Sequence, residues 1–425
     1  MKTFTQQLLD EGTTAGKNLH LEHIEDEIIN FGVAGGRAAI NFIQSLRDMF
    51  AGEAKSPVDI SVKWDGAPAI FAGIDPTDGK FFVGTKGVFA NNPKLVKTNA
   101  DLDKHGYSGG LREKLQIALK NLPALGFKGV LQGDMMFTQS DLETATIGDE
   151  DYIIFQPNTI VYAVPVDSPL ARQIKAAKMG VVWHTTYSGG KVLADMKASF
   201  GANVSGFKKT KNVWYDDATY RDVSGKMLFT KKDTTEITRY LSRAGTVFQK
   251  INSRSLKKFL DMQDALGGAT GGAWSGSGFK TYNNSKVRAG EKVTNARAHA
   301  LGYAKYFENW WKVNQIDKAK MPATKKRKTA LMKQHLRVIR QSQATIIQVV
   351  EFQGHILDAK GLILNKLDTG ARRLARTFIK TKTGFKVTPD EGYVVVDRMK
   401  GSAVKLVDRL EFSYNNFTAI KSWDK

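Results

Sequence analysis

The sequence predicts an α+β protein whose strand-rich core is interrupted by a large, mainly helical insertion. Short strand-like runs recur from residue 58 to residue 187, with one helix expected at 111–121. Two further strand patterns lie near the C-terminus, at 391–396 and 403–407. In the intervening segment the apolar residues follow a helical period from residue 234 onwards. We therefore expect antiparallel sheets assembled from both strand-rich segments.

Length and composition fit a soluble globular protein. The chain has 425 residues, 42% of them hydrophobic, which is enough for roughly two or three domains with sizeable cores. No run approaches the roughly 18 apolar residues that cross a bilayer, and residues 1–6 contain no signal-peptide core. We expect a cytoplasmic protein, in the host cell cytoplasm if it is viral. The absence of cysteine excludes disulfides, thiolate metal sites and cysteine nucleophiles.

The charge predicts a polyanionic partner. The formal net charge is +21 and the isoelectric point is near 9.7, far beyond what solubility requires. Nucleic acid is the favoured partner because each neutralised phosphate releases counterions. A membrane surface is the alternative, but the basic residues are spread through folded-looking segments and are not gathered on one amphipathic helix. We expect a nucleic-acid partner, no membrane and a monomer.

The N-terminal segment, residues 1–55, should be helical and pack on the core. Two helices are expected, at 22–30 and 34–50, with glycines between them. His20 and His23 lack a third metal ligand nearby, so we interpret them as residues of a helix end.

The insertion should span 191–383, between core segments 56–190 and 384–425. Its expected helices are 234–254, 255–265, 296–314, 325–358 and 360–380. A glycine-rich stretch at 267–278 is expected to be a mobile linker. It is not a phosphate-binding loop, because Phe279 separates Gly278 from Lys280 and no strand precedes it.

A basic run marks the insertion as a candidate nucleic-acid-binding surface. Residues 318–350 contain no acidic side chain. A solvated helix face or a localisation signal would also produce such a run. The one-sided charge favours phosphate contacts, with Trp310 or Trp311 as a base-stacking residue and the other in the core. The candidate residues are Lys325, Lys326, Arg327, Lys328 and Arg337, with Arg372, Arg373 and Arg376 on the following helix.

The tetrapeptide Lys63-Trp64-Asp65-Gly66 is the first candidate for chemistry. It ends an alternating run at 58–62 and precedes a second strand that starts at Pro68. A lysine at a strand end can present a nucleophilic amine to a nucleotide. An ordinary hairpin turn with a solvated lysine is the alternative.

Further motifs follow in order along the chain. They are Gly84-Thr85-Lys86-Gly87, Val130-Leu131-Gln132-Gly133-Asp134, Ile160-Val161-Tyr162-Ala163-Val164, Glu391-Gly392-Tyr393-Val394-Val395-Val396 and Ala403-Val404-Lys405-Leu406-Val407. This order resembles the collinear motifs of ATP-dependent DNA and RNA ligases and of mRNA capping enzymes. The resemblance, to phage-type ligases in particular, implies a covalent nucleotidyltransferase core, ATP-grasp-like in its ligase adenylation fold.

The resemblance also implies roles for individual residues. Lys63, Lys405 and Glu391 would be catalytic, and Asp134 and Glu391 would bind Mg²⁺ or Mn²⁺. ATP would contact Val62, Asp65, Gly66, Lys86 and Tyr162. Tyr162 or Phe155 could stack on adenine, but sheet core is the preferred interpretation of both. Asp65 could instead fix the turn, and His184, in a strand at 181–187, is expected to be a core or cleft residue.

The chemistry places a demand on Lys63. Its amine, with an ordinary pKa near 10.4, is protonated at neutral pH and attacks phosphorus only where cations or burial lower that pKa. Lys405 and a bound metal ion would supply such cations. Along 391–396, Glu391, Tyr393 and Val395 share one face, so the acid can point into a cleft.

The chain departs from the family pattern at three positions. Ala67-Pro68 stands where ligases commonly carry an arginine, Asp134 replaces a glutamate, and Val407 replaces a second lysine. Arg409 or Lys400 could substitute for that lysine.

The resemblance implies an ATP-dependent polynucleotide ligase that seals a 5′-phosphate to a 3′-hydroxyl through a lysyl-AMP intermediate. About twenty residues follow Lys405, so we expect no C-terminal OB-fold, and the helical insertion would hold the nucleic acid instead. RNA is slightly favoured as substrate. DNA nick sealing and a non-catalytic nucleic-acid-binding protein are the alternatives.

Overall fold

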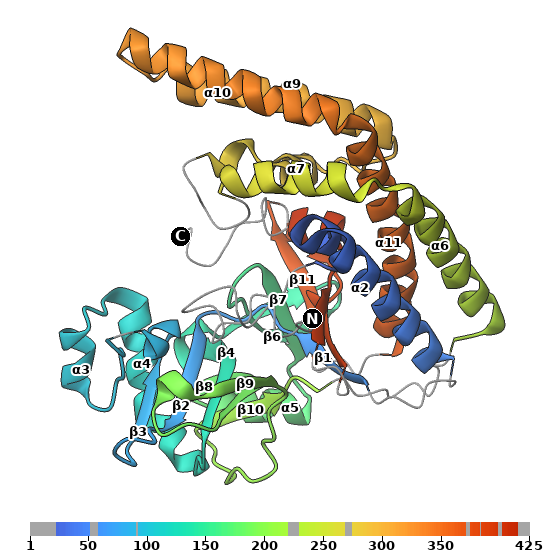
Figure 1. The fold of residues 1–425 in the computed structure, drawn as a ribbon. Coiled ribbons are helices and arrows are strands. Elements are labelled where there is room, and N and C mark those ends of the chain that lie inside the picture. Colours follow the sequence, from blue (N-terminus) through green and yellow to red (C-terminus); the bar gives the residue numbers. More distant parts are fainter. Residues whose placement is uncertain are drawn as a thin grey trace.

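The computed structural model describes residues 23–51, 58–90, 92–219, 229–267, 274–370, 375–382, 384–397 and 402–414. Three β-sheets and three short helices form one part of the molecule, and long helices form the other (Figure 1). Among the described strands every neighbour pair in the three sheets is antiparallel except β8 with β10. The expected mixture of helices and antiparallel sheets is confirmed.

The largest sheet carries six strands. Its order is β10-β8-β4-β2-β3, with β9 also paired to β8. The strands are β2 (Ala69–Ile74), β3 (Phe81–Gly84), β4 (Val130–Thr138), β8 (Met179–Ser188), β9 (Lys197–Phe200) and β10 (Val213–Asp217). Helices α3 (Asn99–Lys104) and α4 (Gly109–Asn121) pack on this sheet, and the buried Leu115 and Ala118 share a hydrophobic cluster with Ile70 and Val83.

Two smaller sheets join the two ends of the chain. The five-stranded sheet has the order β12-β11-β7-β6-β5, and the three-stranded sheet has the order β1-β13-β14. Their strands are β1 (Val58–Lys63), β5 (Glu143–Ile147), β6 (Glu150–Phe155), β7 (Ile160–Pro165), β11 (Arg376–Thr381), β12 (Gly384–Val387), β13 (Gly392–Asp397) and β14 (Ser402–Leu406). Helix α5 (Pro169–Ala176) follows β7. The C-terminal strands therefore complete the same core as the N-terminal ones.

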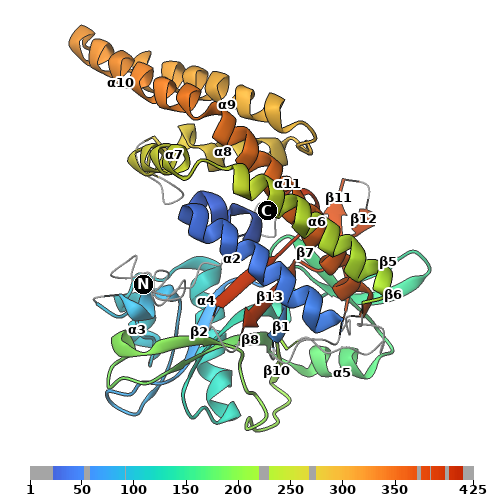
Figure 2. The same ribbon diagram turned by 45° about the vertical axis from the view of Figure 1, so that its right-hand side comes forward.

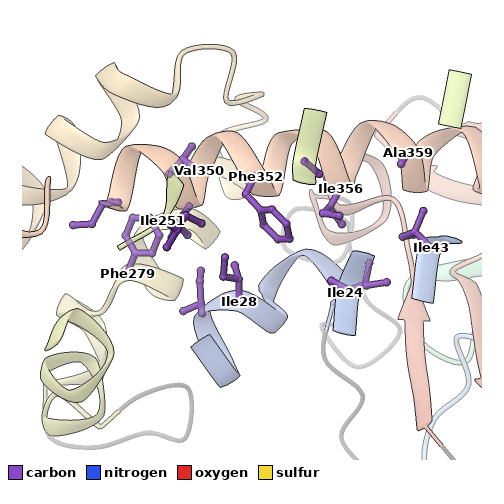
Figure 3. Packing of buried hydrophobic residues seen from close by; sticks show 14 of the residues in the cluster. Ile24, Ile28, Ile43, Ile251, Phe279, Val350, Phe352, Ile356 and Ala359 are labelled. Atoms are coloured by element: carbon purple, nitrogen blue, oxygen red, sulfur yellow. The ribbon is translucent and has the colours of Figure 1, made fainter. Parts of the chain in front are cut away.

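A second layer consists of long helices that share one apolar core. They are α2 (Glu27–Phe50), α6 (Lys231–Lys250), α7 (Ser253–Ala265), α8 (Phe279–Arg288), α9 (Ala296–Trp311), α10 (Pro322–Gln341) and α11 (Gln343–Gly370). Figure 3 shows Ile28 of α2 facing Phe352 and Ile356 of α11. None of the described helices is long and apolar enough to traverse a bilayer.

The N-terminal helix pair is one kinked helix. Helix α2 follows a short 3₁₀ turn, η2 (Ile24–Asp26), and bends at Gly32, which has a φ of 61°. Only glycine adopts such a backbone conformation at little cost, so the break falls at the first of the expected glycines.

Two helix boundaries differ from the expectation. The expected helix 325–358 is divided at Ser342, where α10 ends and α11 begins. The expected helix 360–380 is also wrong in its second half, because α11 ends at Gly370 and β11 begins at Arg376. The run Thr377-Phe378-Ile379 is buried against β7, and this pairing outweighs the helical pattern. Arg376 therefore lies in a strand, while Arg372 and Arg373 lie outside the described residues.

The sheets extend into the segment expected to be helical. Within 191–383, strands β9 and β10 pair with β8, and β11 pairs with β7. Within this segment the first long helix, α6, begins at Lys231. The first part of the expected insertion therefore belongs to the six-stranded sheet, because β9 and β10 pair with the edge of β8.

Candidate active site

A pocket of about 340 Å³ lies between the six-stranded and three-stranded sheets. Strands β1, β4, β8, β9, β13 and β14 all contribute to it. Its lining comprises Ser61, Val62, Lys63, Trp64, Gln132, Asp134, Val182, His184, Thr185, Tyr187, Ala198, Phe200, Ala218, Val394 and Lys405. Four residues that the sequence predicted for the site, Val62, Lys63, Asp134 and Lys405, are brought together here.

Lys63 ends strand β1 at the pocket. Its Nζ donates to Oε2 of Glu391 at 2.5 Å. The contact follows from strand register, because β1 pairs with β13 and Lys63 lies opposite Gly392, the residue after Glu391. The Lys63 side chain is 31% exposed and that of Glu391 is 6% exposed. The amine therefore reaches solvent through the pocket while the acid is enclosed behind it.

The neighbouring acids keep Lys63 protonated. Burial lowers the pKa of the Lys63 ammonium, but the charges of Glu391, Asp134 and Asp65 outweigh burial and raise this pKa above its ordinary value. Burial also raises the pKa of Glu391, against the opposing effect of Lys63. The sequence argument required a lowered pKa for the nucleophile. In the structure the pKa of Lys63 is shifted in the opposite direction.

Lys405 approaches the same pocket from the neighbouring strand. It lies on β14 opposite Val394 of β13, and both residues line the pocket. The charge of Lys405 lowers the pKa of Glu391. On its other side, the backbone of Lys405 is bridged to His23. Lys63 and Lys405 therefore lie on the two strands that flank β13, and Glu391 immediately precedes that strand.

Strand β4 supplies the pocket with two polar side chains. Gln132 and Asp134 are two residues apart and half-buried on the same face, whereas Leu131, Gly133 and Met135 are buried behind them. The hydroxyl of Tyr187 donates to Oε1 of Gln132 at 2.8 Å.

A bulge in β8 adds His184 to this wall. The register with β4 shifts between Gln132 and Gly133, which leaves His184 as the extra residue, so that His184 and Thr185 both face the pocket. His184 Nε2 lies 3.6 Å from Asp134 Oδ2, and its Nδ1 lies 2.8 Å from Thr185 Oγ1. His184, which was expected in the core or in a cleft, therefore lies in the cleft.

Gly66 shapes the pocket without lining it. A Cβ atom at this position would lie 2.4 Å from Cβ of Asp134. A larger residue would therefore displace Asp134, and the expected nucleotide contact of Gly66 is replaced by a packing role.

Asp65 does not line the pocket where a nucleotide contact was expected. It is 4% exposed, and its carboxylate accepts hydrogen bonds from Asn158 Nδ2 and from the backbone N–H groups of Thr159 and Ile160, at 2.6 to 2.8 Å. Burial raises the pKa of Asp65 while these hydrogen bonds oppose the change. Asp65 thus ties the β1–β2 connection to the β6–β7 loop. Because β1 and β2 lie in different sheets, the tetrapeptide is not a hairpin turn either.

Tyr162 belongs to the core behind the site. It is 2% exposed, its hydroxyl accepts from the Asp65 N–H, and its ring stacks on Phe155. Burial raises the pKa of Tyr162 well above its usual value. Neither aromatic residue of this pair lines the pocket, so both are sheet core, which the sequence argument preferred, and the alternative of stacking on adenine is not supported.

Lys86 also lies away from the pocket lining. It is exposed on a 3₁₀ turn, η3 (Lys86–Phe89). Arg409 does not substitute for a second lysine, because its guanidinium donates to Asp26 and Asn284. Lys400 lies outside the described residues. Val407, at the position of that lysine, is fully buried.

Three aromatic residues of the pocket lining, Trp64, Tyr187 and Phe200, were not predicted from the sequence. Trp64, the second residue of the tetrapeptide, packs on Tyr162 with ring centroids 5.2 Å apart and also lines the pocket. Phe200 lines it from β9, a strand within the segment expected to be helical. The short alternating run at 197–200 was the available signal for Phe200.

A nucleotide bound with Mg²⁺ requires a pocket of small-molecule size and an oxygen ligand beside its phosphates. The pocket volume lies at the lower end of the range for small-molecule sites. In the described part of the chain no three His, Asp or Glu residues gather into a metal-binding group. Mg²⁺ often needs only one or two carboxylates together with substrate phosphates, and Asp134 provides one such carboxylate.

Most of the predicted nucleic-acid-binding residues lie on α10. Lys325, Lys326, Arg327 and Arg337 are exposed, and Lys328 is half-buried, with its Nζ donating to Gln315. Arg376, in β11, contacts Glu150 and Tyr152 instead. Trp311 is fully buried, so the expectation that one of the two adjacent tryptophans is core is confirmed.

Comparisons with known proteins give one result. Neither the curated proteins nor the solved structures contain a match to this chain. A family model described as "Family of unknown function (DUF6267)" matches residues 18–421, which includes the pocket and both of its lysines. The chain therefore belongs to the DUF6267 family.

Proposed function

We propose that this protein is an ATP-dependent polynucleotide ligase that uses Lys63 as its nucleophile. The observation that carries the proposal is the arrangement around Lys63 Nζ. The amine faces a nucleotide-sized pocket, an enclosed carboxylate contacts it, and a second lysine and a carboxylate line the same cavity. The resemblance of the ordered motifs to ligases supports the same reading.

In the first step, Lys63 Nζ attacks the α-phosphorus of ATP. A P–N bond forms, the bond to the bridging oxygen breaks, and pyrophosphate leaves. The Lys63 ammonium must lose one proton to attack and a second once the P–N bond has formed. Glu391 is placed to accept the first, since the two groups are already hydrogen-bonded, and the second passes to the departing pyrophosphate or to solvent. Its enclosed position, which raises the pKa of Glu391, makes it a better base than an exposed carboxylate.

Charge neutralisation would come from Lys405 and a metal ion held by Asp134. Both would stabilise the charge that develops on the α-phosphate. Trp64 and Phe200 are the half-buried aromatic residues of the lining and could stack on the base.

Two further steps would join the strands. An oxygen of a 5′-phosphate attacks the adenylate phosphorus, the P–N bond breaks, and the Lys63 nitrogen takes up two protons to become an ammonium again. A 3′-hydroxyl then attacks the 5′-phosphate, loses its proton and displaces AMP. Each step moves a phosphoryl centre, so positioning provides most of the catalysis.

A sealing assay tests the proposal. Purified protein, ATP and Mg²⁺ are incubated with 5′-phosphorylated RNA or DNA, single-stranded or nicked, and joined products are resolved by denaturing electrophoresis. Sealing should occur with the wild type and with Lys120→Ala, an exposed lysine of α4, but not with Lys63→Ala. A protein that only binds nucleic acid would join no substrate, and that result would overturn the proposal.

A further inference from the structure

Helices α9 and α10 form an arm that projects from the rest of the molecule (Figures 1 and 2). The two helices pack through buried residues that include Phe307 and Trp311 of α9 and Met332 and Leu336 of α10. Residues 296–341 contain 12 Lys and Arg and 2 Asp and Glu, a net charge of 12 − 2 = +10 out of +21 for the chain. About half of the excess charge therefore lies on this arm.

The exposed face of α10 orders part of this charge into a stripe. Lys326, Lys333, Arg337 and Arg340 are all exposed and separated by seven, four and three residues, which places them on one side of a helix. With a rise of 1.5 Å per residue the stripe is about 21 Å long. Within the described structure none of the four forms an ion pair, so their charge is available to a ligand.

We propose that this stripe binds the sugar-phosphate backbone of a double-stranded polynucleotide. A straight, rigid row of cations matches the regular phosphates of a duplex, which carries one charge per roughly 1.7 Å of axis. The inference rests on the proposed polynucleotide substrate and specifies its class. A nicked duplex would be held by the arm while its ends reach the pocket.

The aromatic residues of the arm argue against a single strand. Proteins that bind single strands offer exposed rings on which bases stack. Here Tyr303, Phe307 and Trp311 are buried, Trp310 packs over Gly276, and the Tyr306 hydroxyl donates to the Gly276 carbonyl. Among the described residues Tyr414 is the one aromatic counted as exposed, and it lies outside the arm.

A membrane surface fits the stripe less well. Helices that lie on membranes place Trp, Phe or Leu beside their lysines, so that an apolar face enters the lipid. The apolar face of α10, with Met332, Leu336 and Ile339, is buried against the rest of the protein. The exposed side between Lys326 and Lys333 carries only Ala330 as an apolar residue.

Equilibrium binding to fluorescent DNA, without ATP, tests the assignment. Affinity is measured across a salt series for a nicked duplex and for a single strand of the same length. The charge-reversed arm, with Lys326→Glu, Lys333→Glu, Arg337→Glu and Arg340→Glu, should lose at least about tenfold in duplex affinity and about 3 to 4 units of salt slope. Its loss for the single strand should be clearly smaller.

A control variant changes the net charge equally on the sheet side of the molecule, at exposed lysines. It carries Lys104→Glu, Lys120→Glu, Lys175→Glu and Lys191→Glu. The assignment would be overturned if both variants lost the same duplex affinity, or if the charge-reversed arm lost as much affinity for the single strand as for the duplex. Tighter binding of the wild type to phosphatidylserine vesicles than to the duplex would also overturn it. Circular dichroism confirms that each variant is folded. Because no ATP is present, the result is independent of whether Lys63 becomes adenylated.

Discussion

At the residue scale, the chemistry depends on how Lys63 loses its proton. In the structure its ammonium contacts Glu391, and Asp134 also raises its pKa. The triphosphate itself would raise that pKa further, whereas a metal ion and Lys405 would oppose it. The reactive amine should therefore form only when a metal ion is in place to offset the charge of the triphosphate.

The pH dependence of self-adenylation tests this account of Lys63. Reaction requires the neutral amine, and the pKa of Lys63 is raised, so the rate should climb with pH through the neutral range. Glu391→Gln removes the strongest of the groups that raise this pKa, which should shift the rate profile to lower pH. The maximal rate should fall by at least about 10²-fold, as for loss of one preorganised electrostatic contact. Glu113→Gln, at an exposed glutamate of α4, is the control. An unshifted profile in Glu391→Gln would contradict this role.

The sequence motifs correctly predicted which strand residues line the pocket, but they assigned buried neighbours of those residues to the site as well. Lys63, Lys405 and Asp134 all line the pocket, because a side chain on a strand must face one side or the other. Asp65 and Tyr162 were misassigned because their burial depends on the β6–β7 loop, nearly a hundred residues from Asp65. No local pattern encodes that contact.

At the scale of elements, a buried ion network joins the helical layer to the strand of Lys405. Glu25 and Asp26 of η2 are 1% exposed. Glu25 accepts from Lys360 of α11 at 2.7 Å, and Asp26 accepts from Arg409, four residues after Lys405, at 3.0 Å. Burial, followed by the charges of Arg409 and Lys360, holds the pKa of the neighbouring His23 well below its usual range. His23 is therefore neutral where its backbone meets Lys405.

The buried pair Glu25–Lys360 should position Lys405 as well as stabilise the fold. Lys360→Met removes the hydrogen-bonded partner of the buried Glu25 carboxylate, which keeps only the longer ion pair with Arg409 at 3.8 Å, and should lower the free energy of unfolding by up to about 3 to 5 kcal/mol. Adding Glu25→Gln removes that poorly paired charge and should restore part of the loss, as measured by urea unfolding in a double-mutant cycle. The rate of self-adenylation at saturating ATP should recover in parallel with stability. Losses that simply add would show that the two residues do not act as a pair.

The ends of helices could be predicted where a glycine interrupts the helical spacing of apolar residues, and were missed where that spacing continues. The kink at Gly32 coincides with a glycine that the sequence displays. The break between α10 and α11 at Ser342 could not be predicted, because the helical spacing of apolar residues continues from one helix into the next. The change from α11 to β11 was missed because the pairing of β11 with β7 is a long-range interaction.

At the scale of the whole molecule, the pocket requires both ends of the chain. Its walls come from β1, β4, β8 and β9 on one side of the sequence and from β13 and β14 on the other, with the long helices between them in sequence. The three-stranded sheet that carries Lys63 and Lys405 also packs against the helical layer, because Tyr393, Val395 and Leu406 belong to its core. The helices that bear the arm are thus part of the scaffold of the site.

Intact-mass spectrometry after incubation with ATP and Mg²⁺ tests the central claim most directly. The wild-type protein should gain one adenylate, and peptide mapping should place it on Lys63. Lys63→Ala should gain none, whereas Lys86→Ala, at an exposed lysine outside the pocket lining, should still gain one. A wild-type protein that remains unmodified, or an adduct that persists in Lys63→Ala, would contradict the assignment of Lys63 as the nucleophile.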